Sequence, residues 1–297
     1  MVQRSGSRLP PANRVLAALS ILAALFVLLA TWGVLNARAQ PLIRVQTISS
    51  ADWPVADRPI RVALLSDIHL GNVVMDEARL KAIVAQVNAA KPDLVMIAGD
   101  FLVGHDASGA VDRAAKLTGP LLGLKSPLGT VAVLGNHDNW TNAQAVRAAL
   151  TAARITVLEN EAVRRGPLAI AGIGDAFSNR DRADQALAAA RRLGGPLVVL
   201  THSPDLAPKL PADVPLVLAG HTHCGQIVLP WIGALPARSP LRGWKRLYNP
   251  RYRCGLVRDG RRIVIVTAGV GSGTLPFRFG APPDFWLITL APDQGPR

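Results

Sequence analysis

The chain of 297 residues is poor in cysteine, in acidic residues and in aromatic residues. Its two cysteines, Cys224 and Cys254, are too few for a disulfide framework, and their spacing is not typical of zinc or redox motifs. Only 20 Asp and Glu stand against 33 Lys and Arg, a formal net charge of +13 that predicts attraction to phosphates, anionic lipid headgroups or nucleic acid. Charged residues make up 18% and hydrophobic residues 49%, which excludes global disorder and permits a substantial core.

One hydrophobic run, residues 15–35, contains no charged residue. About 21 residues rising 1.5 Å each cross a hydrocarbon core of about 30 Å, so this run predicts a membrane segment. Arg4, Arg8 and Arg14 precede it without an acidic residue, which favours a cytoplasmic N-terminus and an exported remainder. Ala37-Arg38-Ala39 resembles a signal cleavage site, but the run is longer than a signal peptide needs, which favours an uncleaved anchor.

The remainder alternates short apolar runs with helical patterns, which is typical of a β/α architecture. Helical patterns cover residues 76–90, 111–124, 142–153 and 181–193. Polar residues stand at the ends of five apolar runs: Asp67 and His69; Asp100; Asn136, His137 and Asp138; His202; and His221 and His223. Ligands bind outside the carboxyl ends of strands in such sheets, so these residues should converge on one crevice.

The converging set contains carboxylates, an amide and five of the six histidines, without a thiolate among the strand ends. Such donors suit Mn²⁺, Fe²⁺, Zn²⁺ or Mg²⁺. They are too many for one tetrahedral zinc, whereas two ions about 3.5–4 Å apart with a bridging carboxylate would use them all. Two such ions form a clamp for displacement at phosphorus.

The motifs "DIH", "GD", "GNHD", "TH" and "GHTH", in this order, resemble the calcineurin-like metallophosphoesterase superfamily over residues 60–290. The later segments "GQIVLP" and "TAGVGSGTLPFRFGAPPDFWLITL" are similar to its membrane-associated bacterial branch, which includes a cell-wall-associated phosphoesterase and a UDP-2,3-diacylglucosamine hydrolase. Cys224 and Pro283-Asp284 depart from that branch, where Gly-Gly-Gln and Pro-Glu are common.

The resemblance implies a fold, an organisation and roles. The fold is an α/β, four-layer α-β-β-α sandwich of two mixed sheets after one transmembrane helix. We expect the chain to consist of four segments: a cytoplasmic basic N-terminus (1–14), a transmembrane helix or signal anchor (15–35), a linker (36–58) and a metallophosphoesterase catalytic domain (59–297). The metal ligands are Asp67, His69 and His223 for one ion, Asn136, His202 and His221 for the other, with Asp100 bridging.

His137 is implied to be catalytic, stabilising charge at the phosphate or protonating the leaving oxygen. Asp138 either orients His137 or caps the following segment, and Asp175 either faces the crevice or caps a turn. We expect His105 to be a solvated loop residue and Cys224 to be a small buried one.

The stretch from Trp231 to Arg262 combines basic and aromatic residues. It suits docking on anionic lipid headgroups, or it is a basic solvated loop. We expect a single-pass protein of the cell inner membrane with its catalytic domain on the periplasmic side. Its partners are the membrane and a phosphorylated, lipid-linked substrate such as a lipid A precursor, without nucleic acid. The alternative is a membrane-anchored, non-catalytic binder of anionic envelope polymer or lipid.

Overall fold

The computed structural model describes residues 11–50, 58–235, 238–239 and 244–292, and two six-stranded sheets form its centre. The strands of the first sheet are β1 (Leu42–Ser50), β2 (Ile60–Leu65), β3 (Leu94–Ala98), β4 (Thr130–Val133), β5 (Ile155–Val157) and β16 (Asp284–Pro292). Their order is β1-β16-β2-β3-β4-β5, and only β16 and β2 pair antiparallel.

The second sheet is also mixed. Its strands are β6 (Glu161–Arg165), β7 (Leu168–Gly172), β8 (Leu197–Leu200), β9 (Leu216–Ala219), β14 (Gly255–Asp259) and β15 (Arg262–Val266). Their order is β14-β15-β9-β8-β7-β6, with antiparallel pairs at both edges and parallel strands between them.

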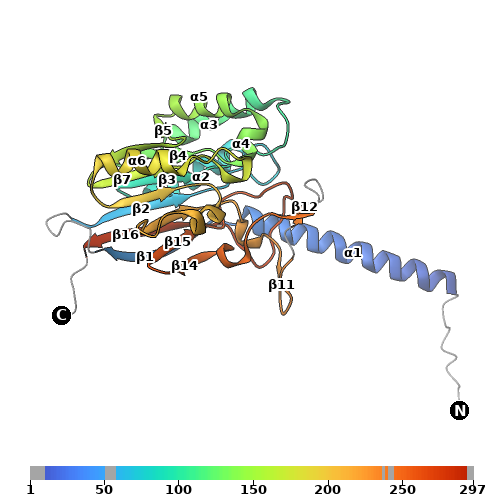
Figure 1. Ribbon diagram of the computed structural model, residues 1–297. Coiled ribbons are helices and arrows are strands. Elements are labelled where there is room, and N and C mark those ends of the chain that lie inside the picture. Colours follow the sequence, from blue (N-terminus) through green and yellow to red (C-terminus); the bar gives the residue numbers. More distant parts are fainter. Residues whose placement is uncertain (1–10, 51–57, 236–237, 240–243, 293–297) are drawn as a thin grey trace, which may run out of the picture.

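Helices cover the outer faces of the two sheets (Figure 1). They are α2 (Glu77–Ala89), α3 (Ala110–Leu122), α4 (Asn136–Thr141), α5 (Ala143–Ala152) and α6 (Ala183–Leu193). The four longer ones lie where the sequence pattern predicts helices. Side chains of α2, α3 and α5 pack with the outer face of the first sheet, and those of α6 pack with the second.

A third apolar cluster fills the space between the sheets. Met96 of β3 and Leu218 of β9 belong to it, while Ile97 and Val217, one residue away in each strand, face the helices. Successive side chains of a strand point to opposite faces, and both faces are covered here, so β3 and β9 are apolar throughout. The predicted α-β-β-α sandwich of two mixed sheets is confirmed.

Helix α1 (Pro11–Arg38) projects from one side of this body as a single long helix (Figure 1). Within it, Asn13–Arg38 is long and apolar enough to cross a membrane, and it contains the predicted span 15–35. Residues 1–10 of the predicted N-terminal segment lie outside the described residues. Only the last turns of α1 pack on the body. A Cβ on Gly33 would meet Phe277 and Phe279, so this glycine permits the close approach.

The predicted linker over residues 36–58 is the main difference between expectation and fold. Its first residues continue α1, and residues 42–50 form the edge strand β1, parallel to β16. Arg44 of β1 donates to the buried carboxylate of Asp284 over 2.5 Å. The local sequence does not indicate a strand here, because the partner strand lies some 240 positions later in the chain. Residues 51–57 lie outside the described part.

Candidate metal centre

The predicted strand-end residues come together at one edge of the two sheets. Asp67 and His69 follow β2, Asp100 follows β3, and Asn136 and His137 begin α4 directly after β4. His202 follows β8 and His221 and His223 follow β9 in the second sheet. Contacts between neighbouring residues connect all eight into one cluster, which is largely buried. The sheets therefore assemble the site from five separate chain segments.

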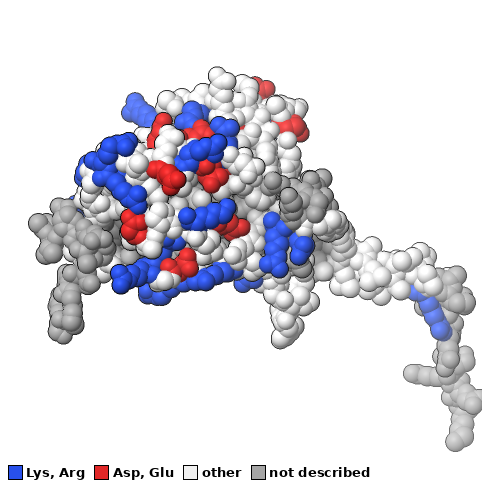
Figure 2. All heavy atoms as spheres, viewed as in Figure 1, with Lys and Arg blue, Asp and Glu red and all other residues white. Residues whose placement is uncertain are grey.

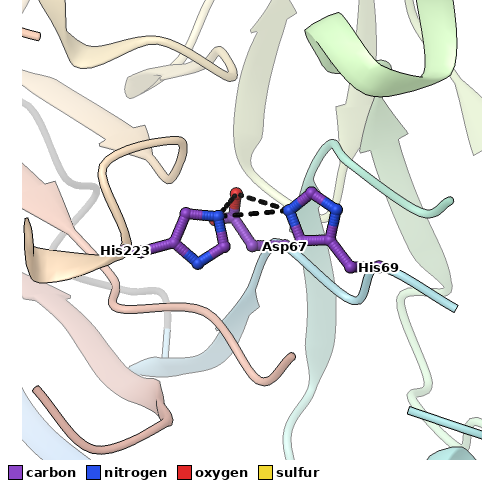
Figure 3. Close-up of side chains that lie close together, drawn as sticks. All are labelled: Asp67, His69 and His223. Carbon is purple, nitrogen blue, oxygen red and sulfur yellow. Dashed lines mark hydrogen bonds and ion pairs between the residues drawn. The ribbon is translucent and has the colours of Figure 1, made fainter. Parts of the chain in front are cut away.

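A first donor group consists of Asp67, His69 and His223, which point toward one another (Figure 3). The two histidine Nε2 atoms lie 3.1 Å apart, and Asp67 Oδ1 is 3.3 Å from that of His223. Each residue offers one ligand atom, and the three atoms lie within 4.8 Å of one another. This spacing is compatible with one shared cation.

The two oxygens of Asp67 have different surroundings. Oδ2 accepts hydrogen bonds from the Ser66 hydroxyl (2.6 Å) and from the His221 backbone N–H (3.0 Å). Oδ1 is buried and has no hydrogen-bond partner within the described part of the chain. A buried carboxylate oxygen that accepts no hydrogen bond is unfavourable, and a cation at this position would satisfy it. The donor set therefore fits a metal ion on geometry and on hydrogen bonding.

A second donor group lies on the other side of Asp100. His202 Nε2 is 3.1 Å from Asn136 Oδ1, 3.2 Å from His221 Nδ1 and 3.3 Å from Asp100 Oδ2. Asp100 Oδ2 is also 3.5 Å from His69 Nε2 in the first group. One carboxylate oxygen thus lies between the two sets of donors.

Backbone carbonyls fix the tautomers of two histidines in the second group. His202 Nδ1 donates to the carbonyl of Ala98 over 2.6 Å, and His221 Nε2 donates to that of Leu247 over 2.9 Å. In a neutral imidazole the other nitrogen then carries a lone pair. In both residues that nitrogen is the one that faces the cluster.

Electrostatics keep the two aspartates charged. Burial alone would raise the pKa of Asp67, but His223 and His69 hold it below its usual range. Burial likewise opposes ionisation of Asp100, yet the surrounding histidines, His202 foremost, hold its pKa well below the usual range. Ionised carboxylates are the form that binds a cation.

The backbone at the site is strained. Five of the site residues have φ between 50° and 70°, the left-handed region: Asp67, His69, Asp100, His221 and His223. Non-glycine residues rarely adopt this conformation, and it clusters at functional sites. Gly220, just before His221, has no room for a side chain, because a Cβ there would collide with Ser66 Oγ and crowd Asp67 Oδ2. The fold thus accepts a cost in stability at the site residues, because their backbone conformation is less favourable than a relaxed one.

His137 lies beside both groups. Its Nδ1 donates to the carbonyl of Gly104 over 2.6 Å, and its ring centre is 4.8 Å from that of His69. Burial lowers the pKa of His137 to about 4, so the imidazole is neutral near pH 7. His69, Asp100 and His137 also have ligand atoms within 4.8 Å of one another. The geometry is therefore compatible with a catalytic or a metal-binding His137.

Two aspartates that the sequence left with open roles are caps. Asp138 accepts backbone N–H bonds from Gly135, Asp100, Phe101 and Leu102, and so ties two ligand loops together. Asp175 accepts from the N–H groups of Phe177 and Ser178 and caps the short helix η1 (Ala176–Ser178).

Sequence reasoning missed two neighbours of the site residues. His105, expected to be a solvated loop residue, is exposed, but its ring lies 4.7 Å from that of His137 and 5.3 Å from that of Trp140. Arg278 is fully buried, and its Nη2 lies 3.2 Å from Nδ1 of His223. The strand-end pattern does not extend to these residues, because they come from loops that contact the site only in the fold.

The two cysteines form a bond that the sequence does not predict. Cys224 is buried, as expected, but it forms a disulfide with Cys254. The bond joins the residue after His223 to the start of β14, and the adjacent Thr222 hydroxyl donates to the carbonyl of Arg253 over 2.6 Å. A single bridge between distant loops leaves no spacing motif in the sequence.

Two facing mixed sheets with two donor groups at their strand ends are an arrangement typical of metal-dependent phosphoesterases. Residues 60–225 match the family described as calcineurin-like phosphoesterase, and the chain belongs to this family. The family is one of phosphoesterases that use divalent metal ions.

Three relatives place it further. The chain is similar to an uncharacterized metallophosphoesterase of Helicobacter pylori (30% identity, 80% of this chain, 61% of the relative). It is also similar to a transmembrane protein with metallophosphoesterase domain of Danio rerio (31%, 88% and 60%). A third is the UDP-2,3-diacylglucosamine pyrophosphatase LpxG of Chlamydia muridarum (28%, 77% and 83%). The chain thus spans about three fifths of the first two relatives.

Proposed function

We propose that this protein hydrolyses a phosphodiester or pyrophosphate bond of a lipid-linked cell-envelope substrate, with two divalent metal ions. The observation that carries the proposal is the position of Asp100 Oδ2, 3.5 Å from His69 Nε2 and 3.3 Å from His202 Nε2. A carboxylate between two donor groups is the arrangement that a two-metal site requires.

Each side chain has a role in the proposal. Asp67, His69 and His223 hold one ion, and Asn136, His202 and His221 hold the other, with Asp100 shared. When bound, the ions would supply positive charge at the phosphoryl oxygens and acidify a coordinated water. Ser66 and the His221 N–H fix one oxygen of Asp67 and leave the other for the ion.

His137 moves a proton in this scheme. Because Nδ1 donates to the Gly104 carbonyl, the neutral ring has its lone pair on Nε2. Nε2 would take a proton from solvent and deliver it to the leaving oxygen, while the proton lost by the attacking water passes to solvent. A group that is neutral before the reaction must first accept a proton, so His137 acts as a base and then as an acid.

The lipid-linked substrate is supported by two observations. Helix α1 is an apolar segment of membrane-spanning length, and the Chlamydia relative is named a UDP-2,3-diacylglucosamine pyrophosphatase. UDP-2,3-diacylglucosamine is thus the first candidate to assay.

We place the catalytic domain on the periplasmic side of the inner membrane. The Cys224–Cys254 disulfide supports this placement, since disulfides persist in oxidising compartments. Thiol labelling of protein denatured directly from cells tests it. An oxidised pair agrees with the placement, and two free thiols would contradict it.

The test of function uses the full chain in detergent or nanodiscs. With Mn²⁺ it should hydrolyse bis(p-nitrophenyl) phosphate, lose activity on chelation and regain it when Mn²⁺ is restored. Hydrolysis of UDP-2,3-diacylglucosamine is measured as the amount of UMP released. Binding of anionic lipid without turnover of either substrate would favour the non-catalytic alternative.

A further inference from the structure

Helix α1 joins the body without a free tether. Gly33 packs against Phe277 and Phe279, and its carbonyl accepts from the N–H of Arg278 over 3.0 Å. Preceding apolar side chains of α1, such as Phe26 and Trp32, are 72% and 60% exposed. With these residues in a bilayer, the segment 277–279 lies at the membrane surface.

A small hairpin is attached to the same segment. Its strands β10 (Val228–Leu229) and β11 (Gly233–Ala234) pair antiparallel. Val228 N–H donates to the carbonyl of Phe279 over 2.8 Å, and Ile227 forms a β-bridge with Phe279. The hairpin projects from the body beside the point where α1 leaves it (Figure 1). Its position relative to the bilayer is therefore set by α1.

The hairpin is apolar and unusually exposed. Residues 227–235, "IVLPWIGAL", contain no charged side chain, and the hairpin is uncharged in Figure 2. At its tip Trp231 is fully exposed and Ile232 is 71% exposed. A groove of about 370 Å³ at its base is lined by Val228, Leu229, Pro230, Phe279 and Gly280. Exposed apolar surface of this kind marks an interaction site, and indole rings favour the membrane interface.

We propose that hairpin β10–β11 lies in the bilayer interface beside α1 and that its groove takes an acyl chain of a bilayer lipid. The occupant follows from continuity with α1, which shares Phe279 with the groove. The neighbouring hairpin of β12 (Arg238–Ser239) and β13 (Lys245–Arg246) exposes Arg238 and Arg246, which suit anionic headgroups. This inference goes beyond the proposed function.

The structure exposes only part of the basic and aromatic docking surface that the sequence predicts over residues 231–262. Tyr248 and Tyr252 are buried, and Arg262 is buried against backbone carbonyls. Arg251 forms an ion pair with Asp259. Arg242 and the side chain of Lys245 lie outside the described residues. Among the described residues of the stretch, the exposed large apolar side chains lie on or beside the two hairpins, while Arg251, Arg258 and Arg261 are exposed outside them.

Docking of the hairpin would also orient the metal centre. The hairpin follows His221 and His223 directly in the chain, and the Phe279 N–H donates to the carbonyl of Gln226 over 2.9 Å. The side-chain oxygen of Gln226 in turn accepts from the N–H of Gly273. Gly273 lies beside the His223 ring. A path of hydrogen bonds thus joins the ligand loop to the proposed bilayer contact.

The docking part is tested with the full chain in vesicles of equal phosphatidylcholine and phosphatidylglycerol. Trp231→Cys carries an environment-sensitive fluorophore, since both native cysteines are in the disulfide. Phe26→Cys on α1 is the positive control, and Val111→Cys, an equally apolar exposed site on α3, is the negative one. Nitroxides on the acyl chains should quench the Trp231 and Phe26 probes but not the Val111 probe. Quenching at Phe26 alone would overturn the docking.

The groove is tested with a phospholipid that carries a diazirine on its acyl chain. Irradiation should label residues 228–230 or Phe279, and Leu229→Glu should remove that label while Leu122→Glu, on α3, leaves it. Both variants should keep the wild-type melting temperature, which shows that they fold. Labelling of the hairpin tip without the groove would overturn the acyl site. Neither test depends on turnover, so failure of the proposed function would be seen separately.

Discussion

Removing the Cys224–Cys254 disulfide should destabilise the domain measurably. The bond closes a loop with a sequence separation of 30. The chain-entropy relation for such a loop gives about 12 cal/mol/K, or about 3.6 kcal/mol at 25 °C. At about 2–4 °C per kcal/mol for a domain of this size, the double variant Cys224→Ala/Cys254→Ala should melt about 7–14 °C below wild type.

The melting temperature is measured on the purified full chain in detergent. Thermal unfolding is monitored by circular dichroism after the signal of the detergent has been subtracted. Reductant supplies a matched control, because it should lower the melting temperature of wild type by a similar amount and leave the double variant unchanged. The reasoning would be refuted if wild type and double variant melted together, or if reductant shifted both equally.

Two further substitutions test the site and its backbone. His137→Ala should lower turnover by roughly 100-fold while the metal content by mass spectrometry stays that of wild type, and loss of one ion would make His137 a ligand instead. Gly220→Ala should lower the free energy of unfolding by about 1–3 kcal/mol and reduce metal content, because its Cβ meets Ser66 and Asp67. Gly119→Ala in α3, where nothing lies within 4 Å of the new Cβ, should be neutral or stabilising, and an equal loss in both variants would contradict the steric argument.

The strands and the site residues were largely predictable because each strand end carries its own local signal. The runs "DLVMIAGD" and "VPLVLAGHTH" are apolar, short and followed at once by donors, and they become β3 and β9 with Asp100, His221 and His223 beyond them. Parallel strands present their carboxyl ends on one edge, which converts a linear pattern into a cluster.

Features that depend on pairing between distant segments were not predictable. Strand β1 pairs with β16, which lies near the other end of the sequence, so a short stretch of sequence cannot reveal the pairing. Ile43 and Val45 of β1 are exposed, and the strand therefore lacks the fully apolar pattern of β3 and β9. The environment of Asp284 has the same origin. Its buried carboxylate accepts from Arg44, Thr267 and the Ala268 N–H. It is a structural carboxylate, which no local pattern reveals.

The most direct test of the two-metal account is the metal content of Asp100→Asn beside its turnover of bis(p-nitrophenyl) phosphate. Asn keeps the shape of the side chain but removes the charge that Asp100 places between His69 and His202. Wild type should bind two divalent ions per chain, and Asp100→Asn should lose at least one ion and most of its turnover. Asp213→Asn, at an exposed aspartate paired only with Arg191 among the described contacts, is the matched control and should behave as wild type. Full metal content together with wild-type turnover in Asp100→Asn would contradict the account.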